Sequence, residues 1–326
     1  MHASSPSTTT HTEEFPDHLH HLTNNIIFID GLPHLDHGEG LVTPLNDDPY
    51  IPDVDAHHIP RTDIERVIVD AITRNRRLLL VGDAGSGKSS AIEQIAARIG
   101  YPCRRLNLNG ETGVSEFVGQ WIVKGQEMAY LYGVLPTAMR CGHLLVLDEL
   151  DAAQPEVLFV LQAVLEGKPL LLTETGESVQ PHRNFRLMAT ANAVGDDSGL
   201  YAGTRVQNAA TMDRWDLILR VGYPKPAEES ELVQRRTGVM ADVANRLVTI
   251  FTDLREACTR GDLAGPFSTR RLVAFAETYR RYGDHQIALK LSVTDRLPAT
   301  ERVIVEEIVR RHLGADGSMA ASAGSA

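Results

Sequence analysis

The stretch LLLVGDAGSGKSS, residues 78–90, determines how the rest of this chain is interpreted. An apolar run at its start leads into GDAGSGKS, residues 82–89, which fits the pattern G-x-x-x-x-G-K-[ST]. Glycines allow the backbone to adopt conformations that other residues avoid and to approach a ligand closely. Residues 90–99 then show apolar side chains at helical spacing. A strand, a glycine-rich loop and a helix in this order predict a loop whose N–H groups bind phosphate.

The loop has an expected task for each residue type. The predicted nucleotide-binding residues are Gly82, Asp83, Ala84, Gly85, Ser86, Gly87, Lys88, Ser89 and Ser90. We expect Lys88 to contact the β- and γ-phosphates of a nucleoside triphosphate, and the Ser89 hydroxyl to bind Mg²⁺. The alternative is a glycine-rich turn that contains Lys-Ser by chance. The strand before the loop and the helix after it favour nucleotide binding.

A second chemical segment is HLLVLDELD, residues 143–151. Its apolar strand ends in Asp148-Glu149, which is typical of a Walker B motif. We expect Asp148 to hold Mg²⁺ and Glu149 to orient and deprotonate an attacking water. The alternative is a surface carboxylate pair after a core strand. However, the carboxyl ends of parallel strands meet at one edge of a sheet, so this segment and the loop together predict nucleotide hydrolysis.

Apolar periodicity predicts an α/β domain followed by a helical one. Strands are expected at 77–81, 103–108, 144–147, 185–191 and 217–221, with hairpins at 119–131 and 170–180 and a strand or anchoring segment at 26–29. Helices are expected at 61–75, 90–99, 135–141, 155–165, 228–236, 239–258, 268–282, 285–291 and 299–313. The predicted domains are a disordered or irregular His-rich segment at 1–45, an α/β nucleotide-binding domain at 46–223, an α-helical domain at 224–313 and a flexible tail at 314–326.

The bulk composition is typical of a soluble globular protein, with 43% hydrophobic and 23% charged residues. The formal net charge of -11 argues against non-specific nucleic-acid binding, which usually needs a basic surface. The three cysteines are far apart and odd in number, so they fit neither a metal site nor a disulfide framework and favour a cytoplasmic location. We see no signal peptide and no apolar run of membrane-spanning length. The His-rich start is interpreted as a solvated tail, with weak metal sensing as the alternative.

Further features lie outside the two motifs. They are a strand-end Asn192, the segment MDRW at 212–215, the two hairpin insertions and the helical C-terminal region. With the two motifs, they resemble the AAA+ ATPases of the MoxR branch. Within that branch, residues 145–215 most resemble the ATPase subunits of aerobic cobaltochelatases, through LDELDAAQPEVLFVLQAVLEG, QPHRNFRLMATANAVGDDSGLYAGT and QNAATMDRW. The resemblance extends more thinly from about residue 50 to residue 313 and does not include the first 45 residues.

The resemblance implies an α/β P-loop AAA+ core with a parallel sheet, a small helical lid domain, and ATP with Mg²⁺ as ligands. It also implies that Asn192 positions water near the γ-phosphate and that Arg270 touches that phosphate from the lid. Arg214 would be the arginine finger that acts on the nucleotide of a neighbouring subunit. Arg205 and Arg271 are rival arginines, but Arg214 has the Asp-Arg-aromatic context of the family. An arginine supplied in trans implies a homo-oligomeric ring, expected to be a hexamer.

The implied function is the remodelling of a partner complex, with Co²⁺ insertion into a corrin precursor as the favoured case. The implied partners are a von Willebrand A-domain protein and a large chelatase subunit. One alternative is a MoxR-type chaperone or activator of another metalloenzyme or of Rubisco. Another is a nucleic-acid or defence-system motor, or a nucleotide switch, although Glu149 argues against the switch. The insertion at 119–131, with Trp121, Met128 and Tyr130, is a candidate surface for the partner or the pore, or a hairpin that only closes against the core.

Overall fold

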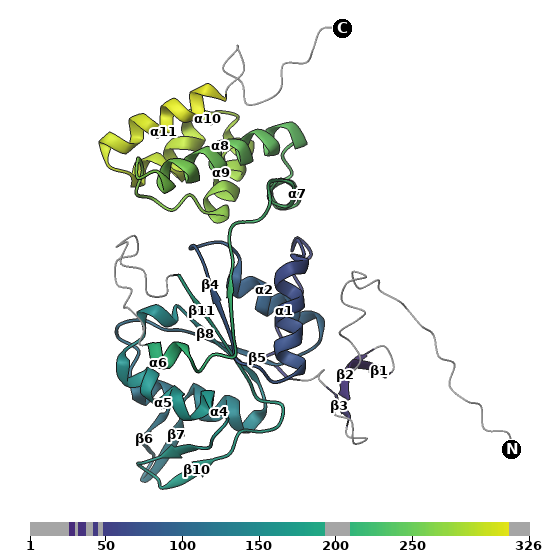
Figure 1. The fold of residues 1–326 in the computed structure, drawn as a ribbon, viewed down its shortest axis with the longest axis vertical. Coiled ribbons are helices and arrows are strands. Elements are labelled where there is room, and N and C mark those ends of the chain that lie inside the picture. The colour runs from purple at the N-terminus through teal and green to yellow at the C-terminus, as the bar shows by residue number, and fades with distance from the viewer. Residues whose placement is uncertain (1–25, 30–31, 37–41, 45–47, 193–208, 313–326) are drawn as a thin grey trace, which may run out of the picture. The chain divides into compact units, whose positions relative to one another are not determined.

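The computed structural model describes residues 26–29, 32–36, 42–44, 48–192 and 209–312 (Figure 1). Their contacts divide the chain into two units. Among the described residues, the first unit contains most of the chain up to Arg220, and the second contains 56–59, 82–87 and the residues from Val221 onward. The domain boundary expected at 223/224 lies between the last strand of the first unit and the first helix of the second.

A five-stranded sheet with the order β12-β4-β11-β8-β5 forms the centre of the first unit, and all its neighbouring strands run parallel. The strands are β4 (Leu78–Val81), β5 (Cys103–Asn107), β8 (Leu144–Asp148), β11 (Arg186–Ala191) and β12 (Leu217–Arg220). Every residue of β4, β8 and β11 is buried. Strands covered on both faces are mostly apolar, which is why these three could be predicted from the sequence, although β8 ends in Asp148 and β11 contains Arg186 and Thr190.

Helices cover both faces of this sheet. They are α1 (Thr62–Thr73), α2 (Lys88–Arg98), α3 (Val114–Phe117), α4 (Val134–Cys141), the short 3-10 helix η1 (Leu150–Ala152), α5 (Pro155–Leu165) and α6 (Ala209–Met212). Figure 1 shows α1 and α2 on one side of the strands and α4 and α5 on the other. The core on the second side joins Leu79 and Leu147 of the sheet to Leu161 of α5, all nearly or fully buried. The helices therefore hold the strand ends in fixed places.

Two hairpins insert where the sequence predicts them. One pairs β6 (Gly119–Lys124) with β7 (Glu127–Tyr132), and the other pairs β9 (Leu170–Leu172) with β10 (Glu177–Val179). The first hairpin does not close fully against the core. Val123 is 75% exposed and Met128 is 66% exposed, and these two side chains are cross-strand partners. Trp121 and Tyr130 pair next to them with their rings edge to face.

Three short strands near the N-terminus differ from the irregular segment expected over residues 1–45. They are β1 (Ile26–Ile29), β2 (Leu32–Asp36) and β3 (Val42–Pro44), and they form an antiparallel sheet. Only β1 follows from its apolar run, because LPHLD and VTP mix polar residues with proline. The histidine cluster at 18–21 lies outside the described residues.

The described residues of the second unit after Val221 are mainly helical. This unit contains α7 (Pro226–Thr237), α8 (Ala241–Thr259), α9 (Thr269–Tyr282), α10 (His285–Ser292), the 3-10 helix η2 (Thr294–Arg296) and α11 (Ala299–Arg311). Its core includes Phe251, whose ring lies edge to face against the rings of Phe267 and Phe275, with 6.4 Å between the ring centroids in each pair. The side chain of Ser268 caps α9 by accepting a hydrogen bond from the N–H of Arg271.

Among the described residues, no helix is long and apolar enough to cross a membrane. Within the same residues, no three histidine, cysteine, aspartate or glutamate side chains gather in a way that could hold a metal ion.

Candidate functional site

The glycine-rich loop, residues 82–87, belongs to the second unit and leaves no room for side chains at two of its glycines. A Cβ on Gly82 would lie 1.9 Å from the carbonyl oxygen of Val221, and one on Gly85 would lie 2.6 Å from Cβ of Ser268. Gly87 has a φ of +91°, yet a Cβ there would meet nothing within 4 Å. Close packing therefore requires glycine at the first two positions. At Gly87 the bare backbone faces open space, as a phosphate-binding loop needs.

Lys88 and Ser89 start α2 in the first unit and bond to two strand ends. Lys88 is a buried residue, and its Nζ donates a hydrogen bond to Oδ1 of Asn192 at 3.2 Å. The Ser89 hydroxyl donates to Oδ1 of Asp148 at 2.6 Å. Asp148 ends β8 and Asn192 follows β11, which are neighbours in the sheet. The structure thus brings together four of the residues that the sequence singles out.

Asp148 is 2% exposed and is surrounded by donors from other strands. Thr190 of β11 donates its hydroxyl to Oδ1 at 2.7 Å, and Arg105 of β5 donates its Nε–H to Oδ2. Arg105 also forms an ion pair with Glu93 at 3.2 Å. Burial alone would lower the pKa of Arg105, but the two carboxylates outweigh it and raise that pKa above its ordinary value. Neither Arg105 nor Thr190 lies in a motif from which this role could be predicted.

Glu149 has a backbone conformation that non-glycine residues rarely adopt. Its φ is 55° and its ψ is 46°, which is the left-handed region, and its side chain is exposed. The N–H of Glu149 donates to the hydroxyl of Thr190 at 3.4 Å, so one threonine fixes both members of the Asp-Glu pair. Strained residues of this kind cluster at functional sites. The turn places the carboxylate of Glu149 outside the core while Asp148 stays buried.

A second buried carboxylate supports Asn192. The N–H of Asn192 donates to Oδ2 of Asp151 at 3.2 Å, and Asp151 is fully buried in η1. This role of Asp151 was not predicted from the sequence, although the residue lies in the HLLVLDELD segment. The sequence feature that could have indicated this role is a charged residue at a position that is buried in the core. Asp151 holds the backbone of Asn192, whose side chain receives the Lys88 bond.

Arg214 is paired within its own chain. Its Nε lies 3.0 Å from Oε1 of Glu166, which follows α5, and its side chain is 27% exposed. Hydrogen bonds from Lys168 and from Arg214 lower the pKa of Glu166. The neighbouring Trp215 is buried in the core of the first unit, and this anchors the Asp-Arg-aromatic segment. The rival Arg205 lies outside the described residues.

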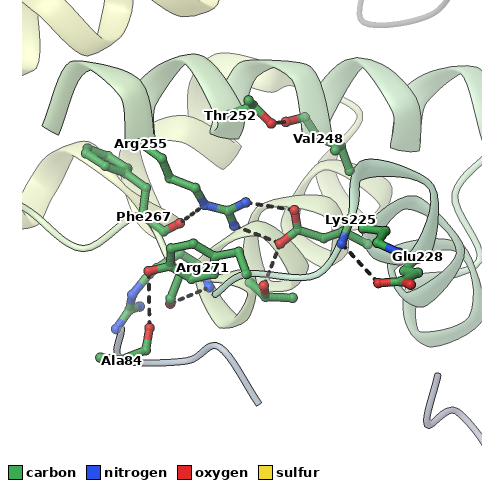
Figure 2. Close-up of polar contacts among 12 residues, drawn as sticks. Ala84, Lys225, Glu228, Val248, Thr252, Arg255, Phe267 and Arg271 are labelled. Carbon is green, nitrogen blue, oxygen red and sulfur yellow. Dashed lines mark hydrogen bonds and ion pairs between the residues drawn. The ribbon is translucent and has the colours of Figure 1, made fainter. Parts of the chain in front are cut away.

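Arg270 is the second residue of α9 and is exposed. Burial, together with the positive charges of Arg296 and Arg270, lowers the pKa of Arg271. Cationic side chains therefore gather at the start of this helix. In the same unit, the carbonyl of Ala84 in the glycine-rich loop accepts a hydrogen bond from the Tyr223 hydroxyl at 3.3 Å (Figure 2).

The donor set suits a nucleotide with a hard cation. The Ser89 hydroxyl and the Asp148 carboxylate are oxygen ligands, which Mg²⁺ prefers. The Lys88 ammonium and the uncovered backbone at Gly87 suit phosphate oxygens. These residues fit the ligands that the sequence predicts.

Comparison with known proteins agrees with this chemistry. One family model, described as AAA domain (dynein-related subfamily), matches residues 77–214, and another, CbbQ/NirQ/NorQ C-terminal, matches 229–311. The aerobic cobaltochelatase subunit CobS of Sinorhizobium sp. is 35% identical over 279 residues, which cover 82% of this chain and 84% of CobS. The chain belongs to the MoxR-type AAA+ ATPases.

Other members of this ATPase branch are similar at lower identity. Protein NorQ of Paracoccus denitrificans is 29% identical, with 69% of this chain and 81% of NorQ covered. Protein CbbQ of Hydrogenophilus thermoluteolus is also 29% identical, with 67% of this chain and 79% of CbbQ covered. The family and the AAA+ fold predicted from the sequence are thereby confirmed. Membership supports ATP hydrolase activity, with the nucleotide and Mg²⁺ that the family uses in general.

Proposed function

We propose that this MoxR-type ATPase is the ATPase subunit of a cobaltochelatase. It would couple ATP hydrolysis in a hexameric ring to Co²⁺ insertion into a corrin precursor. The observation that carries the proposal is the similarity to CobS, which extends over most of both chains. The partners would be a von Willebrand A-domain protein and a large chelatase subunit, with the exposed β6–β7 hairpin as a candidate contact surface.

The residues of the first unit supply the hydrolytic chemistry in this proposal. Ser89 and Asp148 hold Mg²⁺, which neutralises phosphate charge when it is bound. Lys88 binds phosphate oxygens, and its bond to Asn192 positions that amide for orienting the water. Glu149, exposed on its strained turn, takes the proton of the water.

Replacing Glu149 by glutamine tests this assignment. The variant keeps the size of the side chain but loses the base, so it should bind ATP with Mg²⁺ and assemble while turnover falls by two orders of magnitude or more, about the 10²–10⁴-fold typical of such a group. Phosphate release and nucleotide binding are measured on the same preparation. Normal hydrolysis in this variant would contradict the Walker B assignment.

The role of Arg214 is to complete the site of a neighbouring subunit, which requires it to leave or share Glu166. An arginine supplied in trans accelerates phosphoryl transfer by about 10³–10⁵. Arg214→Ala and Lys88→Ala should each be inactive alone. Mixed rings should regain activity, because a subunit with an intact Lys88 site can receive Arg214 from its neighbour. If no mixing ratio restores hydrolysis, Arg214 does not act in trans.

The cobalt reaction has a direct assay. The protein is mixed with chelatase partner subunits, ATP, Co²⁺ and the corrin precursor, and the absorption change on metal insertion is followed. We expect insertion with the wild type and none with Glu149→Gln. Partners that support insertion with another ATPase subunit but not with this one would refute the cobaltochelatase assignment.

A second candidate function is activation of another metalloenzyme or of Rubisco. It is favoured by the CbbQ/NirQ/NorQ C-terminal model, which matches residues 229–311. The Glu149→Gln variant should trap the client, because ATP-bound rings that cannot hydrolyse hold their partners. Identification of the A-domain protein that co-purifies with this variant separates the two candidates.

A further inference from the structure

A buried ion pair lies in the second unit beside the glycine-rich loop. Arg255 of α8 donates two hydrogen bonds to Glu229 of α7, at 2.8 Å and 2.7 Å (Figure 2). The side chains are 15% and 1% exposed. A buried ion pair is weak evidence for stability, because desolvation offsets much of the attraction. The other residues that this ion pair contacts indicate a more specific role for it.

The pair fixes the backbone at the start of α9 from two directions. Arg255 donates its Nε–H to the carbonyl of Phe267 at 2.8 Å, and Glu229 accepts a hydrogen bond from the hydroxyl of Thr269. Phe267 and Thr269 are both buried. Ser268, between them, caps the helix, and Arg270 is the next residue. The direction in which Arg270 leaves the helix start is therefore set by residues on two other helices.

The same arginine reaches the glycine-rich loop through an aromatic ring. The Arg255 guanidinium lies over Tyr223 at 3.9 Å from the ring centroid, and the Tyr223 hydroxyl donates to the Ala84 carbonyl. The loop also touches the start of α9 directly, because Gly85 packs against Ser268 too closely for a Cβ. Figure 2 shows these polar contacts in one cluster. We call Tyr223, Glu229, Arg255 and Thr269 the Arg255 cluster.

We propose that the Arg255 cluster is a positioning device that holds Arg270 and the loop at residues 82–87 in one fixed arrangement. This inference rests on the proposed ATPase function, and on the nucleotide contacts that the sequence and the family resemblance predict for the loop and for Arg270. A purely structural ion pair would not need to bond the residues on both sides of the helix cap as well. The cluster instead links α7, α8, the start of α9 and the loop through one guanidinium group.

Two conservative variants loosen the cluster without leaving a buried charge unpaired. Thr269→Val removes the hydroxyl that bonds Glu229, and Tyr223→Phe removes only the hydroxyl that bonds Ala84. Thr278→Val, on the same helix, is the matched control, because its hydroxyl bonds only the local carbonyl of Ala274. Thermal unfolding should differ little among the three variants.

ATP turnover and the affinity for a fluorescent ATP analogue are the measurements. Thr269→Val should lower kcat/KM for ATP by between about 10-fold and 100-fold, the loss expected from misplacing a binding group by about 1 Å. Tyr223→Phe should weaken analogue binding, and Thr278→Val should match the wild type. In an Arg270→Ala background, Thr269→Val should have no further effect, because it acts through Arg270.

Three outcomes would overturn the inference. One is wild-type kinetics in both Thr269→Val and Tyr223→Phe, although Arg270→Ala lowers turnover; the proposed role of Arg270 would then survive and the positioning role would fail. Another is an additive loss when Thr269→Val is combined with Arg270→Ala, which would indicate a general packing defect. The last is unchanged activity in Arg270→Ala, which would remove the proposed role of Arg270 together with the group that the cluster is said to position.

Discussion

Replacing Arg105 by methionine tests how much the buried carboxylate of Asp148 depends on its ion pair. Methionine keeps a long apolar stem but removes the guanidinium group that bonds Oδ2. The Asp148 side chain is 3% exposed, whereas that of Arg105 is 46% exposed. In its degree of burial, the pair is therefore intermediate between an exposed ion pair and a fully buried one. Hydroxyl groups from Ser89 and Thr190 continue to bond Oδ1 in the variant.

The expected interaction energy between Arg105 and Asp148 lies between the values known for exposed and for buried ion pairs. Exposed pairs contribute about 0–1 kcal/mol, and removing one partner of a buried pair costs about 3–5 kcal/mol. We expect a coupling free energy of about 1–2 kcal/mol between Arg105→Met and Asp148→Asn in a double-mutant cycle. Glu93→Gln is the matched control, because it removes the other partner of Arg105 and leaves Asp148 untouched. Its cost should stay below about 1 kcal/mol.

Tryptophan fluorescence in urea is a suitable assay for this cycle. Both tryptophans of the sequence, the buried Trp215 and the half-exposed Trp121, belong to the first unit, so their signal reports on the unit that contains Arg105. Stability is compared without nucleotide, so that loss of Mg²⁺ binding does not contribute. A coupling free energy below about 0.5 kcal/mol would refute the argument. Asp148 would then be held by its two hydroxyl donors alone.

Other perturbations test other parts of the structure. Burial lowers the pKa of His143 below its ordinary value, so the unfolded chain binds this proton at a higher pH than the folded chain. The contribution of His143 to stability should therefore be constant above about pH 6.5 and fall below it, by at most about 1.4 kcal/mol per pH unit. Between pH 7.5 and 5, the urea midpoint of His143→Gln should fall less than that of the wild type. Cys141 is exposed, whereas burial raises the pKa of Cys103 to about 12, so a thiol reagent at pH 8 should modify Cys141 first, as peptide mapping would show. Gly82→Ala should weaken binding of a fluorescent ATP analogue at least tenfold, because the new methyl group collides with the Val221 carbonyl.

Much of the fold follows from local sequence. β4 and the first four residues of β8 are apolar because both faces of those strands are covered, and turn residues bound the β6–β7 hairpin. The sequence missed α3 and α6, each of four residues, because a single turn has no measurable periodicity. It also missed β2 and β3 for lack of an apolar pattern.

The candidate site was predictable only in part. Lys88, Ser89 and Asp148 lie in motifs, and the structure brings them into contact with each other or with Asn192. Arg105 has no motif. Its place beside Asp148 depends on β5 being the neighbour of β8, and strand order is a property of the whole sheet.

The roles of Thr190 and Asp151 could not be predicted either, because they too depend on how the elements are arranged in the fold. Thr190 bonds Asp148 from β11, the neighbour on the other side, and Asp151 bonds Asn192 from across the chain. These hydrogen bonds depend on which strands and helices are neighbours in the fold, and local sequence patterns do not reveal that. The charged residue at a covered position was the only local indication of Asp151.

The left-handed backbone of Glu149 has a consequence for how sequences at this position would change under selection. A non-glycine residue in that region costs about 1 kcal/mol, which glycine or asparagine would largely avoid. Neither residue could accept a proton from water. A library selected only for thermal resistance should therefore accumulate glycine or asparagine at position 149, and one selected for turnover should keep glutamate. The two selections would pull this single residue in opposite directions.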